Sequence, residues 1–594
     1  MKKYISLILI LALSGIWPSC KQDFLTVKPA GSLDISLLSN PAGIEGLLVG
    51  AYSLLRGANS QFGWQAASTN WVWGSIRGLE ANKGTDSGDQ PDINPIQTYV
   101  ETATNDYLNV QWRSLYEAIS RCNAIITVSN AALTAGKITQ DQATSYIKQA
   151  KTLRGWYHFE AYRMWKNVPY MDEKTDPATV TNSADIGAQI IADLTEGITL
   201  ADNMGQIGKF NSTVAKVLLA KALMQINHDY AGALPLLAAV KTSGTKPDGS
   251  AIGLAPTYGE IFDIEKRNGI EAVYTVQYSV NDGSGGSNAG SGEVLNFPYK
   301  SGGSPGGCCG FFDPTQEFVN SFRTSAGLPL LDGTYNANPV KNDQAIPANP
   351  AKDATTGLAY VDAAFVPDAG PLDPRLDWSV GRRGIPYWDW GLHTGADWIR
   401  DQTYSGPFSP KKQVYKLSQQ GKLTEVGSWT SGYTANGYRM IRYADVLLLL
   451  AECQIETNDL AGALVNINLI RSRAANKAGW VTKIDATGKP LAAVDGNFAA
   501  NYVIANYATL GTQANARVIL QMERKLELGQ EGHRWFDLNR WGNTVTECNR
   551  ILTYEKTMPW GHALYGSATV AAKNLVYPIP QAQIDVSNGK LTQN

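Results

Sequence analysis

Three glutamates stand at a spacing that could support acid–base chemistry. Glu523, Glu527 and Glu531 recur every four residues, so one face of a helix would carry all three carboxylates. Glycoside hydrolysis needs such a pair of carboxyl groups, one of them as the acid. Arginines follow in the same stretch, at positions 524, 534 and 540. We expect an ion-pair and hydrogen-bond network that joins helices, in preference to a catalytic pair.

Other catalytic patterns lack either a residue or the context that they need. The five histidines are scattered, and none belongs to an H-E-x-x-H motif. Residues 302–306 fit G-x-S-x-G, but they lie in a Gly/Pro-rich loop, whereas a nucleophile elbow joins a strand to a helix. The Asp/Asn-rich loops could bind calcium, although no EF-hand spacing is present. The sequence therefore predicts no catalytic residue, no metal ligand and no cofactor.

Composition limits the class of protein. The 594 residues are 44% hydrophobic and 18% charged, which supports a packed core, allows several domains and excludes general disorder. Lys+Arg 51 nearly balances Asp+Glu 53 without any basic block, so a nucleic-acid partner is not expected. The 16 Trp and 27 Tyr residues suit either a core or a surface that stacks on flat ligands.

The N-terminus is typical of an exported protein. A positive start, residues 1–3, precedes an apolar run over residues 4–17 that is too short to span a bilayer permanently. Cys20 follows Ser19 and resembles the acylated cysteine of bacterial lipoproteins, so we expect a signal peptide over 1–19 and lipidation of Cys20. The alternative is an ordinary cleaved signal with an incidental cysteine. Residues 21–23, ending in Asp23, resemble the acidic signal that sends Bacteroidota lipoproteins to the cell surface. These features predict a lipid anchor in the outer membrane, facing the exterior.

The other cysteines show no metal or redox spacing. None of the six forms a C-x-x-C motif. Cys122 and Cys453 lie in helical patterns and are expected to be buried as small hydrophobic residues. The adjacent Cys308 and Cys309 could form a disulfide or remain two free thiols.

Helical periodicity dominates both ends of the chain. The expected helices are 106–130, 142–165, 214–225, 230–240, 439–456 and 460–474. Two helix starts share a phrase, DYAGAL at 229–234 and DLAGAL at 459–464, with Asp229 and Asp459 at the N-cap position. A helix, a short turn and a helix with a small-residue seam predict tetratricopeptide-like repeats.

The middle segment, residues 241–437, differs in composition. It is rich in Gly, Pro, Asn and Asp, which a disordered linker would also show. It is also full of aromatic residues, which disordered linkers lack. Long ordered loops on a rigid frame commonly carry function, so we expect the ligand site here.

Four motifs in order make the chain recognisable. They are LRGWYHF continuing through residues 153–170, YRMIRYADVLL continuing through 438–474, ERKLEL continuing to EGHRWFDL and RWG through 523–542, and YPIP at 577–580. Together they resemble the SusD/RagB family of glycan-binding lipoproteins, across nearly the whole mature chain. The motifs themselves look structural.

The resemblance implies a mainly α fold with little β structure, a tetratricopeptide-like helix-pair scaffold that carries long irregular loops. One SusD-like domain would cover 20–594, with helical parts at 20–240 and 438–594 and the ligand-binding insertion at 241–437. It also implies a non-catalytic surface protein that passes an oligosaccharide or polysaccharide to a SusC-like TonB-dependent transporter.

Two stretches interleave aromatic and polar residues, as a sugar site requires. Sugar rings offer a flat C–H face to an aromatic ring, while their hydroxyls need polar partners. In each stretch two tryptophans alternate with another residue, so an extended loop would point both rings the same way. The alternative is that half of these rings are buried under the loops. The candidate ligand residues are Trp71, Trp73 and Arg77 in the first stretch, and Tyr387, Trp388, Asp389, Trp390 and Trp398 in the second.

Two other classes of function compete with this expectation. A surface glycoside hydrolase would need two carboxyl groups about 5–9.5 Å apart in an open cleft. A helical-repeat scaffold that binds a protein would favour a middle segment poor in aromatic residues, unlike this one.

Overall fold

The computed structural model describes most of the chain. The described residues are 35–57, 63–300, 303–331, 333–344, 346, 351–427, 429–430 and 432–594. The predicted signal peptide, Cys20 and Asp23 lie outside them. Among the described residues, no helix is both long enough and apolar enough to cross a membrane.

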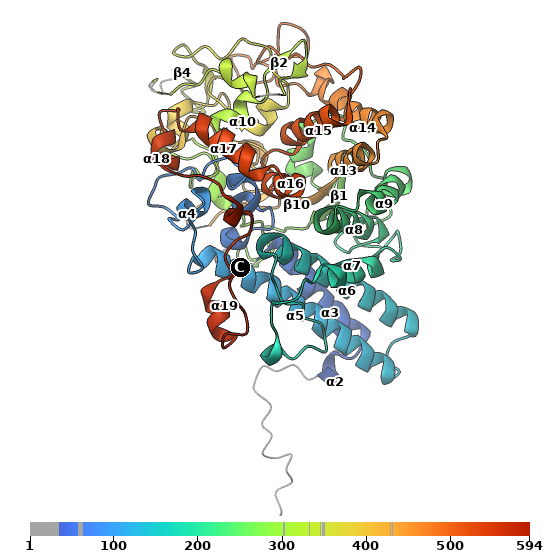
Figure 1. Ribbon diagram of the computed structural model, residues 1–594. Coiled ribbons are helices and arrows are strands. Elements are labelled where there is room, and N and C mark those ends of the chain that lie inside the picture. Colours follow the sequence, from blue (N-terminus) through green and yellow to red (C-terminus); the bar gives the residue numbers. More distant parts are fainter. Residues whose placement is uncertain are drawn as a thin grey trace, which may run out of the picture.

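The long helices form one continuous array. Each packs against the next in chain order, from the lower part of the molecule to its upper right (Figure 1). The array consists of α3 (Pro41–Ser53), α5 (Asp106–Thr134), α6 (Gln140–Trp165), α7 (Gly187–Gly197), α8 (Ser212–Asn227), α9 (Tyr230–Ser243), α13 (Tyr443–Glu456), α14 (Leu460–Ala474) and α15 (Gln513–Leu528). The contact between α9 and α13 closes the gap left by the middle segment, so the helices of both chain ends share one scaffold.

Five of the six predicted helices are confirmed, and the sixth begins later than predicted. Residues 439–442 belong to strand β10 (Tyr438–Arg442), which pairs antiparallel with β1 (Ala272–Val276). The helical pattern of the sequence continued unbroken through this strand into α13. The strand is therefore set by its long-range partner β1 and not by local periodicity.

The repeated phrase has the same geometry in both copies. Asp229 accepts a hydrogen bond from the Gly232 backbone N–H at 2.8 Å, and Asp459 accepts one from Gly462 at 2.9 Å. A Cβ atom at Gly232 would lie 2.3 Å from the capping carboxylate of Asp229. The absence of a side chain at Gly232 therefore leaves space for the carboxylate that caps the helix. On the small-residue face of each helix, the residues that are fully buried are Ala233 and Ala463.

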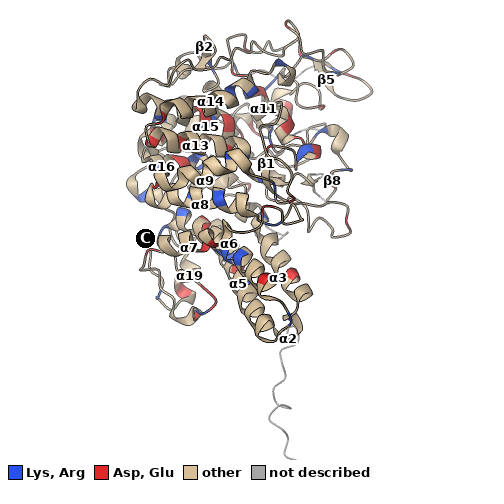
Figure 2. Cartoon of the chain, turned by 90° about the vertical axis from the view of Figure 1, so that its right-hand side faces the viewer, with Lys and Arg blue, Asp and Glu red and all other residues tan. Residues whose placement is uncertain are grey.

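The middle segment is ordered by short antiparallel pairs. Besides β1–β10, the pairs are β2 (Thr324–Ser325) with β3 (Leu328–Pro329), β4 (Ala351–Lys352) with β5 (Ala359–Val361), β6 (Val380–Gly381) with β7 (Ser409–Pro410), and β8 (Thr424–Glu425) with β9 (Tyr433–Thr434). The segment lies beside and above the helical array, with β5 and β8 on the right and β2 at the top of Figure 2. The fold is thus mainly α with little β structure, as predicted.

Shorter helices complete the molecule. They are α2 (Ile35–Leu38), α4 (Ile93–Gln97), α10 (Gln316–Asn320), α11 (Leu376–Ser379), α12 (Gln402–Ser405), α16 (Arg534–Trp541), α17 (Thr544–Glu555), α18 (Gly561–Tyr565) and α19 (Gln581–Val586). The main hydrophobic core takes residues from Ile44 to Leu591, so both ends of the described chain contribute to it.

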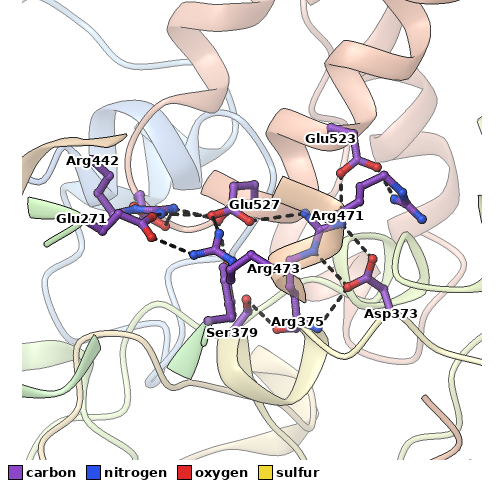
Figure 3. Close-up of polar contacts among 12 residues, drawn as sticks. Glu271, Asp373, Arg375, Ser379, Arg442, Arg471, Arg473, Glu523 and Glu527 are labelled. Carbon is purple, nitrogen blue, oxygen red and sulfur yellow. Dashed lines mark hydrogen bonds and ion pairs between the residues drawn. The ribbon is translucent and has the colours of Figure 1, made fainter. Parts of the chain in front are cut away.

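The glutamates of α15 lie in a buried ion-pair network (Figure 3). Glu527 contacts Arg442 at 3.0 Å, Arg473 at 2.5 Å and Arg375 at 3.3 Å, and all four side chains are buried. Burial raises the pKa of Glu527, but these arginines outweigh it and hold the pKa far below its ordinary value. A carboxylate held in this way cannot act as a general acid, and the expected ion-pair network is confirmed. The expectation that one helix face carries all three glutamates is wrong for Glu531, because α15 ends at Leu528.

The described cysteines are paired or buried. Cys308 and Cys309, for which the sequence left two possibilities, form a disulfide with each other. Cys122 and Cys453 are buried and free, as predicted.

Candidate functional site

The first aromatic stretch lies in the core. Trp71 and Trp73 belong to the π-helix η4 (Trp71–Ile76) and are 2% and 1% exposed. The Trp71 indole N–H donates to the Gly292 carbonyl at 3.0 Å, and the Trp73 ring packs edge-on against Tyr577 at 5.3 Å. The expected exposed platform is absent from this stretch, because the turns of η4 carry both rings inward.

Arg77 is likewise a structural residue. Its guanidinium is fully buried, pairs with Glu101 at 2.6 Å and lies 4.3 Å from the Tyr577 ring centroid and 4.7 Å from that of Trp535. Tyr577 begins the YPIP motif, and Trp535 belongs to the RWFDL motif. Arg77 therefore joins two of the sequence motifs by cation–π contacts and does not face a ligand.

Three residues of the second stretch are also buried. Tyr387 donates its hydroxyl proton to the Pro410 carbonyl, and Trp390 donates its indole N–H to the Tyr415 carbonyl at 2.9 Å. Trp398 packs edge-on against Tyr387, with ring centroids 5.5 Å apart. These rings fill the space beneath the loop. The sequence had left open this alternative, in which part of the rings is buried.

Trp388 and Asp389 face a cavity instead. Trp388 adopts a left-handed backbone with φ of 50°, and the Trp390 N–H returns to the Tyr387 carbonyl at 3.0 Å. The loop is therefore a tight turn and not an extended strand, so Trp388 and Trp390 point in different directions. The expectation that the two rings share one face is wrong, because it assumed an extended backbone.

Three tryptophans line this cavity, which we call the Trp388 groove. Its volume is about 570 Å³. Trp378 of α11, Trp388 and Trp480 come from three separate segments. Thr257, Gly259, Glu260 and Asp263 line a further part of the cavity, and Val481, Thr482, Ile484, Pro490, Leu491 and Ala493 another. A half-open site of this size with mixed aromatic and polar lining suits a small segment of an extended ligand.

The indole N–H groups hold the rings in place. Trp378 donates to the Gly479 carbonyl at 2.7 Å, Trp388 to Lys411 at 3.3 Å and Trp480 to Ala474 at 2.9 Å. Trp378 and Trp388 also contact each other, with ring centroids 5.1 Å apart. Because every indole N–H is already satisfied inside the protein, the groove offers ring surface and not indole donors to a ligand.

Charged groups occupy the margin of the groove. Asp263 accepts from Lys416 Nζ at 2.5 Å and from Gln419 Nε2 at 2.6 Å. Asp389 accepts from the backbone N–H groups of Leu417 and Ser418, at 2.5 and 3.0 Å. These bonds fix the segment 416–419 against the groove and leave carboxylate and ammonium groups beside the tryptophans. Such groups are suitable partners for hydroxyls.

The carboxyl group of Asp263, which lines the groove, is not suited to act as the acid of glycoside hydrolysis. Burial raises the pKa of Asp263, but Lys416 and Gln419 outweigh it and hold the pKa below its ordinary value. A general acid needs the opposite shift. Burial does raise the pKa of Glu80 to about 7 and that of Glu555 to about 8, but neither residue lines the groove.

Sequence reasoning missed two of the three groove tryptophans. Trp378 follows an acidic residue in a short helix, and Trp480 stands alone after a glycine. Neither tryptophan alternates with another aromatic residue, unlike the pairs at 71/73 and 388/390. A hydrogen bond joins residues 378 and 479, which lie about a hundred positions apart in the chain, so local spacing does not predict the proximity of these tryptophans. For Trp480, the only signal in the sequence is a single tryptophan that follows a glycine.

Comparison with known families gives two matches that together span most of the chain. A family described as the SusD family matches residues 270–594. A second family, described as starch-binding and associating with the outer membrane, matches residues 23–246.

Individual relatives are distant but cover nearly the whole chain. A SusD-like protein of Bacteroides ovatus is 20% identical over 90% of this chain and 82% of its own length. Among solved structures, surface glycan-binding protein A of Bacteroides thetaiotaomicron in complex with laminarihexaose has a TM-score of 0.62, 20% identity, and coverage of 93% of this chain and 99% of its own. A SusD homologue from the same species has a TM-score of 0.64 and 20% identity, with coverage of 95% and 99%. At this identity the structures show a shared fold.

Proposed function

Because this chain belongs to the SusD family, we propose that it is a cell-surface protein that captures a glycan and does not itself cleave it. The SusD match covers more than half of the chain, and the helical scaffold is shared with proteins described as glycan-binding. The second family match, described as associating with the outer membrane, supports the location.

The observation that carries this proposal is the Trp388 groove. Three tryptophans from separate segments converge there beside carboxylate side chains, and the indole N–H groups are already bonded inside the protein. Aromatic faces supply the contact with sugar C–H groups, and the charged margin supplies hydroxyl partners. We assign the sugar contacts to Trp378, Trp388 and Trp480, with Asp263, Asp389 and Lys416 at the margin.

A glycan-capturing protein of this kind needs an anchor and an acceptor for its ligand. We propose that Cys20 carries the lipid, that Asp23 directs export to the surface, and that a SusC-like TonB-dependent transporter receives the oligosaccharide. Cys20→Ala is expected to abolish labelling by a fatty-acid analogue and to release the protein from membranes. Equal labelling of wild type and variant would contradict the anchor. Asp23→Ala is expected to leave labelling intact and to reduce cleavage by protease added to cells.

The site is tested by removing one ring at a time. A well-packed aromatic contact contributes about 2 kcal/mol, so Trp388→Ala is expected to weaken glycan binding roughly thirtyfold. Trp378→Ala and Trp480→Ala are expected to weaken it in the same direction. Affinity electrophoresis against a broad panel of polysaccharides identifies the glycan, and calorimetric titration then measures each folded variant.

Trp390→Ala is the matched control from the same turn. Trp390 is 4% exposed and belongs to the main core, so its loss is expected to lower the free energy of unfolding by about 3–5 kcal/mol. The variant that still folds is expected to bind the glycan with the wild-type affinity. Unchanged affinity in all three groove variants would show that the sugar binds elsewhere. Shortened products after incubation with purified protein would contradict the non-catalytic proposal.

A further inference from the structure

A second group of aromatic rings lies outside the Trp388 groove. Trp429 is 37% exposed, more than any other Trp, Tyr or Phe of the described chain. Its ring centroid is 6.1 Å from that of Trp64 and 5.9 Å from that of Tyr433, and both neighbours stand nearly perpendicular to it. We call Trp64, Trp429 and Tyr433 the Trp429 cluster.

Hydrogen bonds fix the backbone that carries the cluster. Trp429 lies between strands β8 and β9, which pair through Thr424 with Thr434 and Glu425 with Tyr433. The Glu425 carboxylate accepts from the Asn281 N–H at 2.9 Å, which attaches the hairpin to the loop that follows β1. Tyr433 in turn packs beside Gly286 and Gly427, where any Cβ atom would meet its ring. Trp429 is therefore exposed in the loop of a hairpin whose two strands are paired and held to the neighbouring loop.

The cluster and the groove belong to one segment of chain. Lys416 and Ser418 line the groove, where Asp263 and Asp389 hold them. The chain then runs directly to β8 and Trp429. Since a chain extends by no more than about 3.6 Å per residue, Ser418 and Trp429 lie at most about 40 Å apart. That span is within reach of one polysaccharide chain.

Polar groups beside the cluster match those beside the groove. Glu425 is only half-buried, and Asp282 of the neighbouring loop is fully exposed, where it accepts from Ser284 N–H at 3.0 Å and from Asn288 Nδ2 at 2.9 Å. Burial of Trp429 against Trp64 and Tyr433 is incomplete, so part of its ring remains available. An aromatic surface beside carboxylate and amide groups suits a sugar ring in the same way as the groove does.

We propose that the Trp429 cluster is a second sugar-contact surface and that one long glycan chain binds both the cluster and the Trp388 groove. This inference rests on the proposed glycan-binding function and specifies its substrate class as polymers in preference to short oligosaccharides. Once one surface is occupied, the second binds the same chain at a high effective concentration, so avidity exceeds the affinity of either surface. A disaccharide can occupy only one surface and gains nothing from the other.

The test compares a polymer with its own disaccharide. Laminarin with laminaribiose and soluble starch with maltose are the probes, measured by affinity electrophoresis and calorimetric titration. Trp429→Ala is expected to weaken binding of the polymer about tenfold, through the lost second contact, and to change disaccharide affinity less than twofold. Trp388→Ala is expected to weaken both. Trp429→Phe keeps an aromatic face and is expected to retain most of the polymer affinity, and Val426→Ala is the matched control for the loop because Val426 is 68% exposed.

Each outcome decides one point. Equal polymer affinity of wild type and Trp429→Ala overturns the second contact. A loss of disaccharide affinity in Trp429→Ala as large as that in Trp388→Ala also overturns it, because the two surfaces would then be one site. Loss of polymer affinity in Val426→Ala as large as in Trp429→Ala would assign the effect to loop structure and overturn the ring contact. Wild-type protein that binds neither probe, nor any glycan of a broad panel, contradicts the proposed function itself.

Discussion

At the scale of single residues, similar sequence patterns have opposite structural roles. Trp71 and Trp73 alternate with another residue as Trp388 and Trp390 do, yet of these four only Trp388 lines the groove, and the other three are buried. The reason is the backbone: η4 turns both of its rings inward, and the left-handed residue Trp388 separates its ring from that of Trp390. Aromatic spacing therefore identified a candidate loop, and the backbone conformation determined which ring faces the cavity.

Arg77 provides a test of this difference. Arg77→Met keeps much of the side-chain volume but leaves the buried Glu101 carboxylate without its cation. Breaking a buried pair in this way costs about 3–5 kcal/mol, so the free energy of unfolding is expected to fall by that amount. Urea denaturation measures the change. The folded variant is expected to bind glycan like wild type, and a selective loss of binding at full stability would place Arg77 back in the ligand site.

At the scale of elements, the sequence predicted local structure well and long-range structure poorly. The helices and their N-cap residues follow from periodicity and from Asp at the cap, both of which are local signals. Strand β10 and the convergence of Trp378, Trp388 and Trp480 depend on partners that are distant in the chain. Two of the three groove tryptophans, Trp378 and Trp480, were therefore inaccessible to arguments from spacing. The family motifs supplied the overall architecture because they encode the contacts between helices.

The two capped helices make a paired prediction. Asp229→Ala and Asp459→Ala each remove a side-chain acceptor from the first turn of a helix, so each is expected to cost about 1 kcal/mol. The similarity of the two caps predicts similar losses in thermal or urea denaturation. Asp→Asn at either position keeps an acceptor oxygen and is expected to restore most of the stability. A loss of stability in only one of the two Asp→Ala variants would indicate that the two N-caps do not contribute equally to stability.

At the scale of the whole molecule, buried ion pairs join the sequence motifs to the middle segment. Arg442 and Arg473 of one motif and Glu527 of another meet Glu271 and Arg375 from the middle segment (Figure 3). A hydrogen bond joins the first and last motifs, because the Trp165 indole N–H donates to the Pro578 carbonyl of the YPIP motif at 3.0 Å. The loops that carry the groove are thus fixed to the helical array by polar contacts as well as by packing.

Removal of one central carboxylate tests that linkage. Glu527→Gln leaves three buried arginines short of a counter-charge and is expected to lower the free energy of unfolding by about 3–5 kcal/mol. Asp495→Asn is the control, because the Lys477–Asp495 pair is exposed and contributes at most about 1 kcal/mol. Urea denaturation of both variants measures the difference. Equal changes in the free energy of unfolding would show that the network contributes no more to stability than an exposed ion pair does.

The stability of the protein in acid depends on the same network, because carboxylates with a lowered pKa bind fewer protons in the folded state than in the unfolded state. Burial raises the pKa of Glu531, but Arg442 and Lys412 outweigh it and hold the pKa at about 2, below the ordinary value of 4.5. The unfolded chain therefore binds a proton that the folded chain does not, so this contribution is complete above about pH 4.5 and is lost as the pH falls toward 2. Urea midpoints measured from pH 6 down to pH 3 are expected to fall most steeply below about pH 4.5. Glu531→Gln, which cannot titrate, is expected to flatten that decline, and a variant with the wild-type slope would show that Glu531 is not among the groups that set acid stability.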